Sequence, residues 1–324
     1  KTTRDHILGI SYLSQTVLGV LGNTAMFLVY VRIFVARPQQ QKPTDLILTH
    51  PSGTNTVTLL TRGVPETMAA FGMKNILDDV GCKIVLYVRR VARGLSICTT
   101  CLLSVFQAVT VGPGTSRWSR FKPGAPRYIL PSFLFFWILN MLISISLIVS
   151  APTTTNISIT RHIYVSKYCS SMPRGSDVIV VVTLTATTLR DLVFVCLMAW
   201  AGGYTVIVLR RHHRRVRHVH GVSRPLRSST ETRAIHTILL LVGCYVCFCW
   251  TTSCMALYLG SAKEYDPRLQ RVSDFLSACY PLLCPWGLIS RDPRIHRPRS
   301  VLENQSGPSL PVAGSIHRSI KRMY

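Results

Sequence analysis

Three arginines lie within a stretch of sequence that is otherwise typical of a membrane span. Arg89, Arg90 and Arg93 come just before the apolar run SICTTCLLSVFQAVT, and a later apolar run contains Arg190 followed directly by Asp191. Ionisable side chains inside a span are costly and commonly mark a ligand site or an ion pathway. Because a guanidinium binds carboxylates and other oxygen acceptors, these five residues predict a binding site for a small molecule.

The spacing of the arginines places two of them on one face of a helix. Arg89 lies about 10 Å along a helix from Cys82, at a rise of about 1.5 Å per residue. Arg93 lies one turn deeper on the same face, because residues i and i+4 align, whereas Arg90 is turned by about 100°. An alternative stays open at this point: Arg90 or Arg93 pairs with Asp191, or with loop acids, and only stabilises the bundle.

The sequence contains no recognisable catalytic set or metal-binding motif. The ten histidines are scattered or lie in a basic segment, and there is no HExxH, Walker A or GxSxG motif. The run CYVCFC contains a C-x-x-C, but it lies inside an apolar stretch without a neighbouring His or acid, which favours packing over zinc binding. We therefore expect no enzyme, no cofactor and no metal.

The composition of the 324-residue chain is that of a membrane protein. Hydrophobic residues make up 48% and charged residues only 15%, and the mean hydropathy is +0.30. A soluble domain has about 25% charged residues. The net charge of +24 does not indicate a nucleic-acid partner, because the basic residues lie in short segments between apolar runs.

Seven apolar runs predict an all-α membrane protein, a bundle of seven transmembrane helices. We expect one seven-helix domain over residues 1–290 and a basic tail over 291–324, whose Pro, Ser and Gly content predicts disorder. The expected spans are residues 7–35, 46–64, 80–110, 128–149, 178–209, 234–259 and 275–290.

The distribution of charge predicts how the bundle is oriented. The segments after spans 1, 3, 5 and 7, together with Arg32 near the end of span 1, hold 22 basic residues, and the opposite side holds 11. The positive-inside rule then places the N-terminus outside and the C-terminus in the cytoplasm. The sequon at Asn156 falls in an outer loop, where we expect it to be glycosylated.

Two cysteines lie at the expected outer surface. Cys82 is at the outer end of the third span and Cys169 is in the loop after the fourth. Both face an oxidising compartment, where a disulfide can persist; the alternative is two unrelated thiols.

Basic residues dominate the segment between the fifth and sixth spans, and Arg214, Arg215, Arg217 and Arg233 are among them. Such a segment attracts anionic membrane lipids, and it can also form a docking surface for an intracellular transducer. Gln107, near the cytoplasmic end of the third span, suits an interhelical hydrogen bond.

Several stretches resemble one family of receptors. They are GVLGN at 19–23, DLILTH at 45–50, RVARGLSICTTCLLSVFQAVT at 90–110, SSTETRAIHTILLLVGCYVCFCW at 228–250 and YPLLCPW at 280–286. In these runs the chain resembles the vomeronasal type 1 receptors, which are G-protein-coupled pheromone receptors with seven helices. The block GLSICTTCLLSVFQAVT is specific to that family, and the similarity covers nearly the whole chain.

The resemblance implies a multi-pass receptor of the plasma membrane that binds a small chemosignal and activates an inhibitory-class heterotrimeric G protein. It supports the Cys82–Cys169 bridge and glycosylation at Asn156. It also implies that Gln107, with the four arginines of the basic segment, lies where the G protein couples. Within this interpretation Arg89, helped by Arg93 or Arg190, receives an acidic or hydrogen-bond-accepting group of the ligand.

One departure from the family pattern leaves a rival interpretation open. Pro51, Ser52 and Gly53 replace the Leu- and Ala-type residues that the family usually has after its LTH motif. Proline and glycine disturb a helix, so a kinked span or a receptor relic that folds poorly is the alternative. A transporter is a further one, but the sequence lacks the internal repeats expected of that class.

Overall fold

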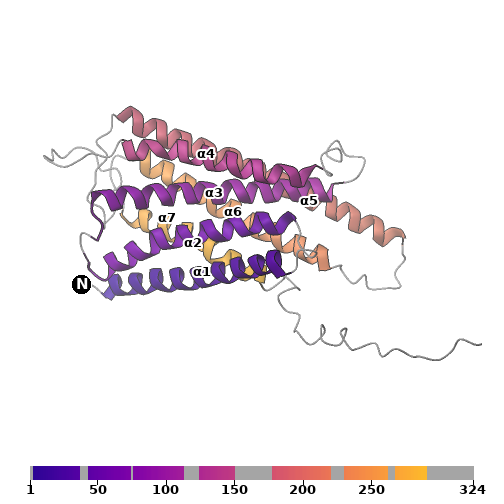
Figure 1. The fold of residues 1–324 in the computed structure, drawn as a ribbon, viewed down its shortest axis with the longest axis horizontal. Helices are drawn as coiled ribbons and strands as arrows, with labels where there is room; N and C mark the ends of the chain where they lie inside the picture. Colours follow the sequence, from indigo (N-terminus) through magenta and orange to yellow (C-terminus); the bar gives the residue numbers. More distant parts are fainter. Residues whose placement is uncertain are drawn as a thin grey trace, which may run out of the picture. The chain divides into compact units, whose positions relative to one another are not determined.

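The computed structural model describes residues 3–36, 43–73, 76–112, 124–149, 177–219, 230–261 and 267–289. These residues form seven long helices and one short 3-10 turn (Figure 1). The elements are α1 (Thr3–Ala36), α2 (Pro43–Ala70), α3 (Asp79–Val111), η3 (Ala125–Tyr128), α4 (Ile129–Val149), α5 (Asp177–Val219), α6 (Thr230–Ser261) and α7 (Pro267–Ile289). The all-α fold predicted from the sequence is confirmed.

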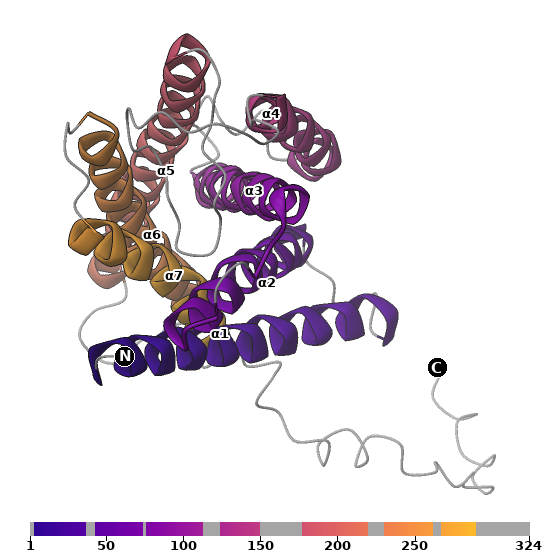
Figure 2. The same ribbon diagram turned by 90° about the vertical axis from the view of Figure 1, so that its left-hand side faces the viewer.

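Helix α3 is the most enclosed of the apolar helices. It packs against α2, α4 and α5, while α1 packs against α2 and α7 (Figure 2). In its most apolar stretch 78% of α3 is buried, against 22–33% in the equivalent stretches of α1, α4, α5 and α7. The outer helices therefore turn leucine, isoleucine and aromatic side chains away from the bundle, as a lipid environment requires.

Five of the described helices are long and apolar enough to cross a membrane: the stretches are His6–Ala36, Val80–Val111, Ala125–Ile145, Thr185–Arg211 and Arg268–Ile289. In α6 the apolar stretch is shorter, Val242–Met255. Helix α2 has no such stretch, because its sequence is rich in Thr, Ser, Asn and Pro.

The polar side chains of α2 are satisfied mostly by their own helix. The hydroxyl groups of Thr49, Ser52, Thr56 and Thr58 each donate to the carbonyl four residues earlier, at 2.7–3.1 Å. A hydroxyl that bonds its own backbone does not need a partner in lipid. Helix α2 also continues through the buried Pro51, so the departure from the family pattern is accommodated within a helix.

Asn23 of α1 bonds a backbone carbonyl that a proline of α7 leaves free. Pro285 has no N–H to offer the carbonyl of Pro281, four residues earlier. The amide nitrogen of Asn23 donates to that carbonyl at 2.7 Å, and to the carbonyl of Gly19 at 2.8 Å. This bond satisfies a backbone group that the proline frees and joins α1 to α7.

Candidate functional site

One half-buried carboxylate joins α2, α3 and α7. Asp274 Oδ1 lies 2.7 Å from Arg62 Nη2 and 3.5 Å from Arg89 Nη2. Gln270 Nε2 donates to the same oxygen at 3.1 Å from one turn earlier in α7. We call these four residues the Asp274 cluster.

A second carboxylate, which is buried, joins α3, α4, α5 and α6. Asp191 Oδ1 accepts from its neighbour Arg190, at 3.0 Å from Nε and 2.6 Å from Nη2. Arg190 Nη1 donates to Asn140 Oδ1 at 2.7 Å. Arg93 Nη2 lies 3.5 Å from Asp191 Oδ2 and 3.3 Å from Thr252 Oγ1. We call these five residues the Asp191 cluster.

The Asp191 cluster depends on the absence of a side chain at Gly94. A Cβ atom at this position would overlap the side-chain oxygen of Asn140 and the guanidinium of Arg190. Gly94 lies next to Arg93 in α3, so this glycine lets α3, α4 and α5 approach closely where the ions meet.

Each cluster contains one closely paired, buried arginine and one loosely paired, more exposed arginine. Arg62 and Arg190 pair closely, and only 4% and 5% of their side chains are exposed. Arg89 and Arg93 pair loosely at 3.5 Å, and 25% and 35% of their side chains are exposed. The loosely paired arginines are the two that helical spacing places on one face of α3.

Each carboxylate is thus shared between two guanidinium groups. In each cluster the shorter pair already supplies a counterion to the buried arginine, and the α3 arginine adds a positive charge with a long contact. Such an arrangement can accept a further anionic group at Arg89 and Arg93 without leaving Arg62 or Arg190 unpaired.

The structure shows where the other predicted residues lie. Arg90 is half-buried in α3, Gln107 is 3% exposed in the same helix, and Arg214 is exposed in α5. Arg215 and Arg217 lie in α5 and Arg233 in α6, but their side chains are outside the described set. No group of His, Cys, Asp and Glu suited to a metal occurs among the described residues.

The predicted disulfide and glycosylation site are only partly within the described chain. Cys82 is 1% exposed near the start of α3, and its sulfur is disulfide-bonded. Cys169 and Asn156 lie outside the described residues. The Cys82–Cys169 pairing and the glycan therefore stay predictions.

Five members of the clusters were not predicted from the sequence: Arg62, Asn140, Thr252, Gln270 and Asp274. Arg62 and Asp274 lie at the edges of apolar runs and were assigned to the outer side, although α7 begins at Pro267 and includes Asp274. The sequence contains one signal for Arg62 and Asp274. The predicted spans hold more arginines than carboxylates, and buried arginines require carboxylates nearby.

Comparison with known proteins connects this arrangement to one family. A sequence model of the vomeronasal organ pheromone receptor family matches residues 6–300. Olfactory receptor class A-like protein 1 of Danio rerio is 37% identical over 290 residues, covering 89% of this chain and 90% of the relative. Vomeronasal type-1 receptor 3 of Homo sapiens is 37% identical over 300 residues, covering 91% and 94%.

A further relative and a solved structure agree with these matches. Vomeronasal type-1 receptor 4 of Homo sapiens is 38% identical over 291 residues, covering 88% of this chain and 94% of the relative. The crystal structure of squid rhodopsin has a TM-score of 0.68 at 15% identity and covers 94% of this chain and 86% of that one. At this low identity the likeness to rhodopsin shows the fold alone.

Proposed function

Because this chain belongs to the vomeronasal type 1 receptor family, we propose that Arg89 and Arg93 receive an acidic group of its chemosignal. The chain is a chemosensory G-protein-coupled receptor of the plasma membrane and not an enzyme or a transporter. The proposed ligand is a small molecule with an apolar body and a carboxylate, sulfate or similar oxygen-rich group.

A single observation carries this proposal. Arg89 and Arg93 are the more exposed arginines of the two clusters, and each is held at 3.5 Å by a carboxylate that has a closer partner. A bound anion gains charge-assisted hydrogen bonds from both guanidinium groups, and such bonds are stronger than those between neutral groups. The contacts of Arg89 with Asp274 and of Arg93 with Asp191 are long, and both arginines are partly exposed; ion pairs of this kind contribute little.

Binding of an anion at α3 also provides a mechanism for activation. Arg89 links α3 to Asp274 of α7, and Arg93 links α3 to Asp191 of α5 and Thr252 of α6. An agonist that engages these arginines weakens the links and favours arrangements in which α3, α5 and α6 re-pack. A ligand shifts the population toward whichever arrangement it binds more tightly.

The G protein would couple at the opposite end of these helices, with the N-terminus outside the cell. Gln107 in α3 and the basic ends of α5 and α6, with Arg214, Arg215, Arg217 and Arg233, are the proposed contacts. The basic end of α5 also suits anionic lipids of the inner leaflet. We assign the partner to the inhibitory class, which the resemblance to vomeronasal receptors implies.

The acidic-ligand proposal is tested in cells that express the chain with an outer tag. Activation of an inhibitory G protein is recorded for a panel of acidic steroid conjugates and neutral volatiles, and surface tag is measured in the same wells. We expect acidic compounds to dominate the responses, and Arg89→Gln to lose them at unchanged surface level. Unchanged responses in Arg89→Gln, or responses to neutral compounds only, would contradict the proposal.

Two controls separate the parts of the proposal. Arg127→Gln removes an exposed arginine from η3 and should leave the responses unchanged. ADP-ribosylation of inhibitory-class α subunits should abolish signalling, and a response that survives this treatment would overturn the assignment of the G protein class. A chain retained inside the cell would instead support the receptor-relic alternative that Pro51 raises.

A further inference from the structure

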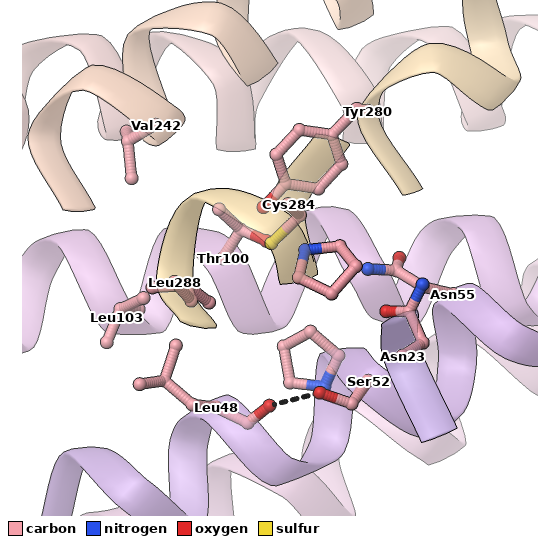
Figure 3. A pocket seen from close by; sticks show the side chains of 12 residues that line it. Asn23, Leu48, Ser52, Asn55, Thr100, Leu103, Val242, Tyr280, Cys284 and Leu288 are labelled. Atoms are coloured by element: carbon pink, nitrogen blue, oxygen red, sulfur yellow. Dashed lines mark hydrogen bonds between the residues drawn. The ribbon is translucent and has the colours of Figure 1, made fainter. Parts of the chain in front are cut away.

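A small cavity lies among α1, α2, α3, α6 and α7 (Figure 3), and the described residues on its wall belong to neither charged cluster. The cavity volume open to a water molecule is about 20 Å³, and one ordered water needs roughly 10–15 Å³. The polar residues on its wall include Asn23, Ser52, Asn55, Thr100 and Tyr280. We call it the Asn55 cavity.

One polar group on this wall has no protein partner. Asn55 is 1% exposed; its Oδ1 accepts from Ser96 Oγ at 3.0 Å, and Ser96 Oγ in turn accepts from Tyr245 O–H at 3.2 Å. The amide nitrogen, Asn55 Nδ2, is buried without a hydrogen-bond partner among the described residues. A buried amide donor beside a cavity of this size is a position where proteins hold ordered water.

The surrounding groups can complete the coordination of a water molecule. Ser52 Oγ donates to Leu48 O at 3.1 Å and Thr100 Oγ1 donates to Ser96 O at 2.8 Å. Each hydroxyl donates its single proton to a backbone carbonyl, and its oxygen keeps lone pairs that can accept a hydrogen bond from water. A water here would accept from Asn55 and donate to these oxygens, which gives it the two to four partners it needs.

The chemistry of the wall disfavours a cation. Among the residues that the structure describes, no carboxylate lines the cavity, and the unpartnered atom is an N–H donor, which repels a positive charge. A cation in this low-dielectric interior would have no counterion, and burying an isolated charge is costly.

We propose that the Asn55 cavity holds an ordered water molecule that accepts a hydrogen bond from Asn55 Nδ2. This water extends the chain Tyr245–Ser96–Asn55, which joins α6, α3 and α2, to the hydroxyl groups of Ser52 in α2 and Thr100 in α3 on the cavity wall. Pro51 and Ser52, two of the residues that depart from the family pattern, lie on this wall. Pro51 and Ser52 therefore form part of a water site between the helices. This proposal does not depend on which chemosignal the receptor binds.

The test is X-ray radiolysis of the intact receptor in water labelled with oxygen-18, with mass spectrometry of the cysteines. Hydroxyl radicals form at bound waters and label adjacent side chains even when bulk solvent is excluded. Cys284 lines the cavity, whereas Cys98 is a buried free cysteine outside its wall. We expect label at Cys284 to form several-fold faster than at Cys98, and equal rates would overturn the proposal.

Two variants and one change of salt complete the test. Asn55→Leu removes the donor and Ser52→Val adds bulk to the wall, so either should bring the Cys284 rate down to that of Cys98. Replacing sodium by choline should leave the rate in the native chain unchanged, and a faster rate without sodium would show a cation in place of water. If Asn55→Leu does not fold, Ser52→Val alone decides, and an unchanged Cys284 rate in that variant contradicts the proposal.

Discussion

The Asp191 and Asp274 clusters have the same composition of charges but are built differently. In the Asp191 cluster the close pair, Arg190 and Asp191, comes from neighbouring residues of one helix, α5, and Asn140 of α4 fixes the arginine. In the Asp274 cluster the close pair joins two helices, with Arg62 from α2 and Asp274 from α7. Motion between helices therefore leaves the first pair intact and separates the second.

This difference suggests a division of roles. The Asp191 cluster joins α5 to α4 through Arg190 and Asn140, and α5 to α3 through Asp191 and Arg93. Arg190 keeps its counterion whatever Arg93 does, because the close pair lies within α5. The Asp274 cluster connects α7 to α2 and α3 only through ion pairs between helices. A motion of α7 relative to α2 and α3 therefore changes the contacts of Asp274 with Arg62 and Arg89.

The largest effect is expected from removing the charge of Asp191. Asp191→Asn leaves Arg190 buried without a counterion, which costs about 3–5 kcal/mol when one partner of a buried pair is lost. Thermal unfolding of the purified receptor should show a strongly lowered midpoint. The double variant Arg190→Gln/Asp191→Asn should be more stable than Asp191→Asn alone, and an equal or lower midpoint would contradict a buried ion pair.

A smaller loss is expected at the glycine that the Asp191 cluster requires. Gly94→Ala forces a methyl group against Asn140 and Arg190, and overpacking of this kind costs about 1–3 kcal/mol. The unfolding midpoint and the surface level should both fall. Gly243→Ala is the matched control, because nothing lies within 4 Å of a Cβ there; equal effects at both positions would rule out a close approach at Gly94.

The smallest loss of stability is expected from the loosely paired arginines. Arg89→Gln and Arg93→Gln remove long, partly exposed contacts, which contribute at most about 1 kcal/mol. Arg62→Gln leaves Asp274 without its closest partner and should lower the unfolding midpoint more than Arg89→Gln. The reverse order would mean that Arg89 is a structural residue and not available to a ligand.

The sequence predicted some parts of this arrangement well because they depend on one helix at a time. The i, i+4 spacing of Arg89 and Arg93 and the apolar run that carries them both lie within α3. The bond from Arg190 to Asp191 joins consecutive residues. The possibility that Arg93 pairs with Asp191 was also open from the sequence, and the two lie 3.5 Å apart.

The remaining contacts depend on which helices are neighbours, and periodicity does not contain that information. Arg62 and Asp274 are 212 positions apart in the numbering and meet only because α2 and α7 are adjacent. The need for a glycine at position 94 likewise arises from Asn140 and Arg190 on two other helices. Polar residues at the edges of apolar runs were therefore assigned to the surface when they belong to the interior.

The most direct measurement compares an acidic agonist with its methyl ester on the native receptor, Arg89→Gln and Arg93→Gln. The ester keeps the apolar body and removes the charge, so only the contact with the guanidinium groups changes. We expect each substitution to lower the potency of the acid by about tenfold or more, which corresponds to about 1.4 kcal/mol, and to leave the ester nearly unchanged. An equal loss for acid and ester would show that these arginines do not receive the acidic group.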